Sequence, residues 1–254
     1  LRPFALTDEE AAGAPESARL LPIKIGKGKN KYKFTMTVSP LDCMGCGVCV
    51  TQCGTHALEL VPMESQLEQQ KVFDYCVKNV SDKPDMFKAD NVKFSQFKTP
   101  HLEFSGSCAG CAETSYARLV TQLFGDHMMI SNATGCSSIW GGPAATSPYT
   151  VNKEGKGPAW ANSLFEDNAE HGLGMYLGQK KIRDDLKAKT EELVALPGCC
   201  AELKAAAQAW LDTYDDTEAN QAAAKAYIAE LKDSIVSADD CIAFLGSDKA
   251  KEYF

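Results

Sequence analysis

The residues best suited to chemistry are cysteines at a regular, short spacing. A C-x2-C-x2-C-x3-C run is formed by Cys43, Cys46, Cys49 and Cys53. This is the spacing of bacterial-type [4Fe–4S] binding, in which the fourth cysteine of a two-cluster ferredoxin ligates the other cluster. Gly45 and Gly47 let the backbone wrap around a cube and bring N–H groups near its sulfides. We therefore predict that the first three thiolates share one cluster and that Cys53 reaches toward a second.

A zinc site and a disulfide scaffold are the alternatives for these thiols. Zinc sites usually use two ligand pairs separated by a longer loop, so three evenly spaced cysteines suit a tetrahedron poorly. Seven of the eleven cysteines lie in tight, glycine-rich clusters, which favours metal ligands over disulfides. One departure from the ferredoxin pattern is Gly54, where proline usually follows the fourth cysteine.

A second group of candidate ligands follows the first. Cys108 and Cys111 form a C-x2-C pair, which alone would be weak evidence for a metal site. Cys136 lies in a Thr-Gly-Cys turn. Their setting is more specific, because three small-residue stretches occur in order after the ferredoxin motif: 102–114, 132–141 and 157–170. In this order they resemble the pyruvate:ferredoxin (flavodoxin) oxidoreductase family, from Leu1 to about residue 178.

The resemblance implies an activity and its cofactors. Members of the family convert pyruvate and coenzyme A into acetyl-CoA and carbon dioxide with thiamine diphosphate, and pass electrons through three [4Fe–4S] clusters to ferredoxin or flavodoxin. It also implies a cytoplasmic homodimer. Cys108, Cys111 and Cys136 match ligands of the cluster nearest the thiamine, and Glu113 and Cys136 match positions that line the thiamine site. The first cysteine run matches the more distal pair of clusters.

Other parts of such an enzyme are expected outside this chain. They are a further cysteine run before Leu1, and a Gly-Asp-Gly segment for Mg²⁺ with a lone cysteine after Phe254. Gly246-Ser247-Asp248 resembles that segment only superficially. The sequence is thus expected to be a catalytically inert piece of a longer protein, spanning the end of a ferredoxin-like domain and the start of a thiamine-diphosphate domain.

These residues must be positioned by an α/β (α+β overall) fold of several parts. We expect a ferredoxin-like part at 1–61, a connector at 62–104, and the start of an α/β thiamine-diphosphate-binding domain at 105–254 with a helical insertion at about 177–235. Alternating polarity predicts a strand at 32–38, with 57–61 as its partner, and short apolar runs predict strands at 128–130 and 242–245. The apolar positions of 66–78 and 116–124 predict helices. Thr217 is expected to cap a helix in the insertion.

Charge and hydropathy exclude some partners. The 34 acidic residues outnumber the 26 basic ones, whereas a nucleic-acid-binding domain needs a basic patch. No apolar run is long enough to span a bilayer. We therefore expect neither nucleic acid nor membrane as a partner.

Several reactive or aromatic residues have ordinary interpretations. The pair Cys199-Cys200 is expected to be solvent-exposed, whereas Cys76 and Cys241 are expected to be buried thiols. Asn162 and Glu166, four residues apart, predict a shared helix face and a structural hydrogen-bonding role. The tryptophans at 140 and 160 are expected to pack rather than relay electrons.

Two other functions compete with an enzyme segment. They are a standalone ferredoxin-type electron carrier and a non-catalytic iron–sulfur subunit. A carrier needs no residues 105–176, and a separate subunit should carry complete motifs. The sequence does not fix which 2-oxoacid is used, or whether ferredoxin or flavodoxin accepts the electrons.

Overall fold

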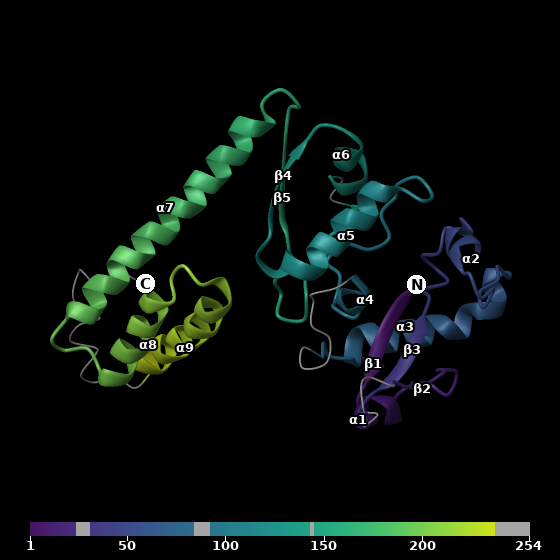
Figure 1. Cartoon of the computed structure of the whole chain (residues 1–254), viewed down its shortest axis with the longest axis horizontal. Helices are drawn as coiled ribbons and strands as arrows, with labels where there is room; N and C mark the ends of the chain where they lie inside the picture. The colour runs from purple at the N-terminus through teal and green to yellow at the C-terminus, as the bar shows by residue number, and fades with distance from the viewer. Residues whose placement is uncertain (24–30, 84–91, 143–144, 237–254) are drawn as a thin grey trace. The chain divides into compact units, whose positions relative to one another are not determined.

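The computed structural model describes residues 1–23, 31–83, 92–142 and 145–236. The chain divides into two compact units, Leu1–His171 and Gly172–Phe254. The first unit contains strands β1 (Arg2–Leu6), β2 (Leu21–Pro22), β3 (Lys33–Thr37), β4 (Met129–Ala133) and β5 (Ala159–Ser163), labelled in Figure 1. Its helices are α1 (Asp8–Ala12), α2 (Val48–Gln52), α3 (Leu67–Asn79), α4 (Val92–Ser95), α5 (Ala112–Phe124) and α6 (Cys136–Gly141), with 3-10 turns η1 (Met63–Gln66) and η2 (Gly125–His127). This mixture of helices and strands confirms the predicted α/β class.

The first sheet is a small antiparallel one with strand order β1-β3-β2. β3 confirms the strand predicted at 32–38 and pairs with β1 in the register Arg2↔Thr37 to Leu6↔Lys33. The predicted strand at 57–61 is wrong, because those residues form no strand and the edges of β3 are taken by β1 and β2. Both flanking strands contain proline, Pro3 and Pro22, which is tolerated there because an edge strand has one side free of ladder hydrogen bonds.

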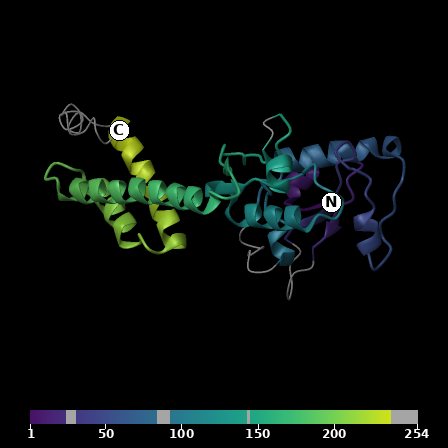
Figure 2. The ribbon, with the colours of Figure 1, turned by 90° about the horizontal axis from the view of Figure 1, so that it is seen from above.

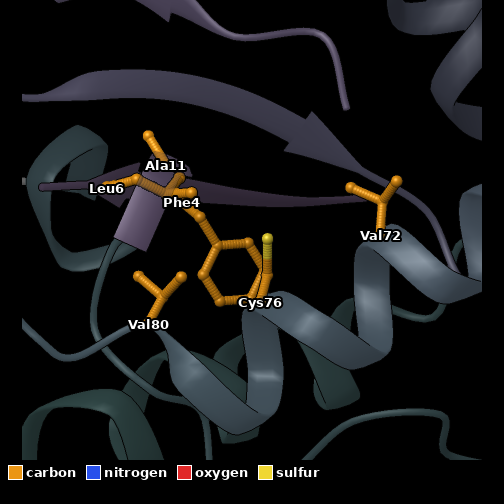
Figure 3. Close-up of a cluster of buried hydrophobic side chains, with 6 residues drawn as sticks. All are labelled: Phe4, Leu6, Ala11, Val72, Cys76 and Val80. Carbon is orange, nitrogen blue, oxygen red and sulfur yellow. The ribbon is translucent and has the colours of Figure 1, made fainter. Parts of the chain in front are cut away.

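Helix α3 covers this sheet and closes the main apolar cluster of the first unit. It confirms the helix predicted at 66–78, and it lies within the range expected to be a connector. The cluster contains Phe4, Leu6, Ala11, Val72, Cys76 and Val80 (Figure 3). In this close-up the ring of Phe4 lies between Cys76 and Val80. Cys76 is fully buried, as predicted, and burial raises the pKa of its thiol to about 11.

The second sheet is a parallel pair, β4 and β5, in the register Met129↔Ala159 to Ala133↔Ser163. The predicted short strand at 128–130 is confirmed as the start of β4, and the predicted helix at 116–124 is confirmed as part of α5, which begins at Ala112. The chain passes from β4 directly into α6. Asn162 lies in β5 rather than on a helix, so the predicted shared face with Glu166 is wrong.

The described part of the second unit is helical, as predicted for residues 177–235. α7 (Asn168–Ala195) begins in the first unit, and α8 (Ala201–Asp212) and α9 (Thr217–Val236) follow it. Figure 2 shows α8 and α9 beside the C-terminal part of α7, where Leu203, Ala207, Trp210 and Tyr227 form a buried cluster. Among the described residues, no helix combines the length and the apolar character needed to cross a membrane.

Two predictions for this unit need correction. The residue before α9, Asp216, accepts a hydrogen bond from the Ala219 backbone N–H at 3.0 Å, so the cap is Asp216 and Thr217 is already helical. Cys199 and Cys200 are half-buried rather than exposed, because both pack against the helical cluster. The predictions for Cys241, the strand at 242–245 and residues 246–248 lie outside the described residues.

Replacing Leu6, which is fully buried, should weaken the first unit. We expect Leu6→Ala to lower the free energy of opening of the β1–β3–α3 region by about 2–5 kcal/mol, because it leaves a cavity in the apolar cluster. Hydrogen exchange of the β1, β3 and α3 amides measures this. Leu21→Ala, on exposed β2 of the same sheet, is the matched control and should change it by no more than about 0.5 kcal/mol. Equal effects of the two substitutions would contradict this core.

Candidate iron–sulfur and cofactor site

The first cysteine run forms a tight turn followed by the short helix α2. Gly45 and Gly47 adopt φ values of 66° and 74°, in the left-handed region that glycine enters at least cost. A Cβ atom on Gly45 would meet nothing within 4 Å, so its backbone conformation, rather than lack of space, explains the glycine. Cys43, Cys46 and Cys49 are exposed and Cys53 is half-buried. Both glycines therefore have the left-handed backbone that the predicted wrapping requires, and the convergence of the thiols on one cluster stays a prediction.

Neighbouring hydrogen-bond donors favour the ionisation of the Cys53 thiol. Its Sγ atom accepts a hydrogen bond from the Ala57 backbone N–H at 3.2 Å and lies 3.5 Å from the Thr55 hydroxyl. The Thr55 hydroxyl, and then the Ala57 N–H, lower the pKa of Cys53 by stabilising the thiolate. Because metals bind thiolate rather than thiol, this environment suits a ligand.

Cys108 and Cys111 lie in a second tight loop at the start of α5. The Cys111 N–H donates to the Cys108 carbonyl at 3.0 Å, and Gly110 between them has φ 73°. Cys111 is the N-cap of α5. The backbone N–H of Thr114, and then that of Glu113, lower the pKa of Cys111, as expected for a thiol at a helix N-terminus.

The two cysteine loops approach each other. A Cβ atom on Gly110 would lie 3.8 Å from Cγ2 of Val48, the first residue of α2. Val48 precedes Cys49, and Gly110, which is 62 positions later in the sequence, lies between Cys108 and Cys111, so the two loops are near each other. Sequence spacing alone gave no sign of this approach.

Cys136 lies on α6, which a side-chain hydrogen bond links to α5. It is the first residue of α6 and is exposed. One turn later, buried Trp140 donates from Nε1 to the Glu113 carboxylate at 3.4 Å. Glu113 is in the first turn of α5, two residues after Cys111, so this bond links the first turn of α5 to the end of α6. Trp140 therefore packs, as predicted, and also holds a predicted site residue.

The loops that carry Cys43–Cys53 and Cys108–Cys111 approach each other, but the predicted ligands do not form a single-ion site. Among the residues that the structure describes, no three His, Cys, Asp or Glu side chains converge to hold one metal ion. A cluster distributes its thiolates over separate iron atoms, unlike a tetrahedral zinc site, whose ligands all bind one ion. The donor set fits the cluster in its chemistry: thiols only, left-handed glycines, and lowered pKa values at Cys53 and Cys111.

An ion triad that the sequence analysis missed anchors this region. Glu103 accepts from Arg2 of β1 at 3.1 Å and from Arg118 of α5 at 3.0 Å. The side chains of Arg2 and Glu103 are only 8% and 17% exposed, so the charges are largely withdrawn from water. Burial is the main reason that the pKa of Arg2 lies below its usual value. Glu103 is 101 residues from Arg2 and 15 residues from Arg118, so no short-range sequence pattern indicates the triad.

Hydroxyl and amide side chains gather at the carboxyl ends of β4 and β5. They are Ser131, Asn132, Thr134, Asn162, Ser163 and Asn168, joined by hydrogen bonds of 2.7–3.3 Å. Open parallel sheets bind ligands at this end of their strands. This end of the sheet, which is separated from Cys136 by only Thr134 and Gly135, thus has the polar side chains that a polar ligand needs.

Comparison with known proteins identifies the type of domain that contains the first cysteine run. Residues 36–59, which contain the first cysteine run, match the family model of the 4Fe-4S binding domain. The chain therefore includes an iron–sulfur segment.

Longer relatives define the family. The chain is 49% identical over 220 residues to a pyruvate-flavodoxin oxidoreductase of Klebsiella pneumoniae, and 47% identical over 220 residues to a pyruvate:ferredoxin oxidoreductase of Moorella thermoacetica. Both matches cover 86% of the chain but only 18% and 19% of those proteins. A pyruvate dehydrogenase [NADP(+)] of Cryptosporidium parvum is 47% identical over 72% of the chain and 10% of its own length. These matches confirm the resemblance: the chain is a relative of the pyruvate-flavodoxin and pyruvate:ferredoxin oxidoreductases and corresponds to about a fifth of their length.

The ion triad should be sensitive to loss of its carboxylate. Glu103→Gln leaves the guanidinium groups of Arg2 and Arg118 without a counter-charge. We expect this to lower the free energy of opening of β1 and α5 by about 3 kcal/mol, which is the lower end of the range for buried pairs because Arg118 is partly exposed. Hydrogen exchange of β1 and α5 measures the loss. Glu68→Gln, which breaks the exposed pair with Lys71, should change stability by less than about 0.5 kcal/mol. Unchanged protection in Glu103→Gln would refute the anchoring role.

Thiol reactivity should separate the predicted ligands from the core cysteine. Because a lowered pKa increases the thiolate fraction near neutral pH, Cys53 and Cys111 should react with iodoacetamide at lower pH than Cys76, whose pKa is about 11. Peptide mass spectrometry across a pH series measures this in the metal-free chain. Thr55→Val should shift the Cys53 profile to higher pH and leave that of Cys111 unchanged. Identical profiles for all three thiols would contradict this assignment.

Proposed function

We propose that this chain is the part of a 2-oxoacid oxidoreductase that carries electrons away from the reacting pyruvate. In the overall reaction, pyruvate and coenzyme A become acetyl-CoA and carbon dioxide, and two electrons and a proton are released. The electrons leave through [4Fe–4S] clusters to ferredoxin or flavodoxin. The observation that carries this proposal is the approach of the two cysteine loops at Gly110 and Val48, in a chain related to pyruvate oxidoreductases.

The residues are assigned to two groups of ligands. Cys43, Cys46 and Cys49 would hold one cluster, with Cys53 directed to another. Cys108, Cys111 and Cys136 would hold the cluster nearest the cofactor. The lowered pKa values of Cys53 and Cys111 support their role as thiolate ligands. The domain division at residues 61 and 104 is part of the same proposal.

Thiamine diphosphate, when bound, would supply the electron sink for decarboxylation. Glu113 would face it from the first turn of α5, oriented by the hydrogen bond from Trp140. Mg²⁺ on the diphosphate would be held by residues outside this chain. The described residues contribute the wall beside the cofactor: the α5 and α6 first turns and the polar ends of β4 and β5.

A standalone electron carrier has less support. The 4Fe-4S family model covers only residues 36–59, whereas similarity to the pyruvate oxidoreductases extends over 220 residues. A homodimer and a cytoplasmic location remain part of the proposal through the family resemblance.

Anaerobic reconstitution of the chain with ferrous iron and sulfide tests the ligand assignment. Because the family resemblance implies further cluster ligands outside this chain, we expect substoichiometric chain-bound iron and acid-labile sulfide, with an electron paramagnetic resonance signal after dithionite reduction. Cys46→Ser and Cys111→Ser should each lose bound iron, because each removes a ligand from a different set. Cys200→Ser, in the helical unit, is the control and should lose none. Full iron content in both ligand variants, or preferential binding of zinc without sulfide, would overturn the assignment.

A further inference from the structure

The end of β4 is unusually polar for a parallel strand. Paired parallel strands are commonly rich in Val, Ile and Leu, but β4 ends in Ser131-Asn132-Ala133 and β5 in Asn162-Ser163. Asn132 and Asn162 are register partners, and Asn132 is 91% buried. Buried amides are costly unless they are hydrogen-bonded, so these residues need a reason beyond packing.

The amide of Asn162 joins β4 to the turn that follows it. Its Oδ1 accepts from Asn132 Nδ2 at 2.7 Å, and its Nδ2 donates to the Thr134 hydroxyl oxygen at 3.3 Å. The Thr134 hydroxyl in turn donates to the Ser163 carbonyl at 2.9 Å. Thr134, the first residue after β4, is therefore tied to β5 at two points.

The other side of the turn is fixed as well. The Gly135 N–H donates to the Ser138 hydroxyl oxygen at 2.8 Å, and that hydroxyl donates to the Gly135 carbonyl at 2.6 Å. Cys136 lies between these two anchors, and its own side chain is exposed. A held backbone with an accessible thiol is the arrangement that a preorganised ligand requires.

From this geometry we propose that Thr134 and Asn162 are positioning residues, which fix the β4–α6 turn so that Cys136 reaches the same cluster as Cys108 and Cys111. The inference rests on the proposed function, because it assumes that Cys136 is a ligand. Thr134 is exposed, so its hydrogen bonds contribute little to overall stability. Its loss should therefore act on the turn and the cluster rather than on folding.

The test uses the whole chain with Cys43, Cys46 and Cys49 replaced by serine, so that bound iron reports the second ligand set. In this background Thr134→Val removes the hydroxyl without changing the shape of the side chain. Reconstituted anaerobically with iron and sulfide, it should need roughly tenfold or more iron for half-loading, as is typical when a residue that orients a ligand is lost. Thr134→Ser keeps the hydroxyl and should restore loading.

A matched control lies in the second unit. Thr213 accepts from Asn220 Nδ2 at 3.2 Å, so Thr213→Val breaks the same type of pair away from the cysteines. It should leave iron loading unchanged. Asn162→Ala is a second test variant and should weaken loading as Thr134→Val does. Equal loading of Thr134→Val and the parent would overturn the proposal.

Hydrogen exchange of the metal-free chain separates this inference from the proposed function. Thr134→Val should speed exchange in the peptide covering residues 133–138 by about tenfold, and Thr134→Ser should not. Protection of α3 and α8 should stay the same in both variants, which excludes general unfolding. If the parent binds no iron but Thr134→Val speeds exchange at 133–138, the ligand assignment fails, whereas the role of Thr134 in fixing the turn is supported. If Thr134→Val leaves exchange at 133–138 unchanged, that role is refuted.

Discussion

The carboxylate of Glu103 is the interaction on which the arrangement of the first unit depends. It neutralises Arg2, whose strand belongs to the antiparallel sheet, and Arg118, whose helix begins with a predicted ligand loop. The Arg2 side chain is 8% exposed and that of Arg118 is 24% exposed, so both guanidinium groups need a counter-charge at this point. The triad therefore ties α5, and with it the loop that carries Cys108 and Cys111, to β1 of the antiparallel sheet.

Around this anchor, short polar contacts determine where each site residue lies. Trp140 holds Glu113, and the amide of Asn162 holds the turn before Cys136. Glu113 is two residues after Cys111, and Trp140 is one helical turn after Cys136. Thr134, which accepts from Asn162, is two residues before Cys136. The chemistry is thus assigned to exposed thiols on a backbone that is fixed by less reactive neighbours.

The sequence predicts the chemistry of the site better than its geometry. The spacing of the cysteines indicates the cluster type because wrapping around a cube is a local property, and Gly45 and Gly47 have the left-handed backbone that this requires. Helical periodicity likewise identified α3 and α5. The partner of β3 could not be predicted, because β1 lies some thirty residues away and contains Pro3, which masks a strand pattern. Asn162 was misplaced because its four-residue spacing to Glu166 also fits a strand followed by a turn.

Gly110 lies where the two cysteine loops approach each other. Cγ2 of Val48 is 3.8 Å from the position that a Cβ atom on Gly110 would take, an ordinary contact distance, so lack of space does not require glycine there. The left-handed backbone does, because an L-residue at φ 73° is strained. If each loop carries a cluster, as we propose, a substitution that relaxes this backbone would move one cluster relative to the other and change the rate of electron tunnelling between them, although the residue is not a ligand.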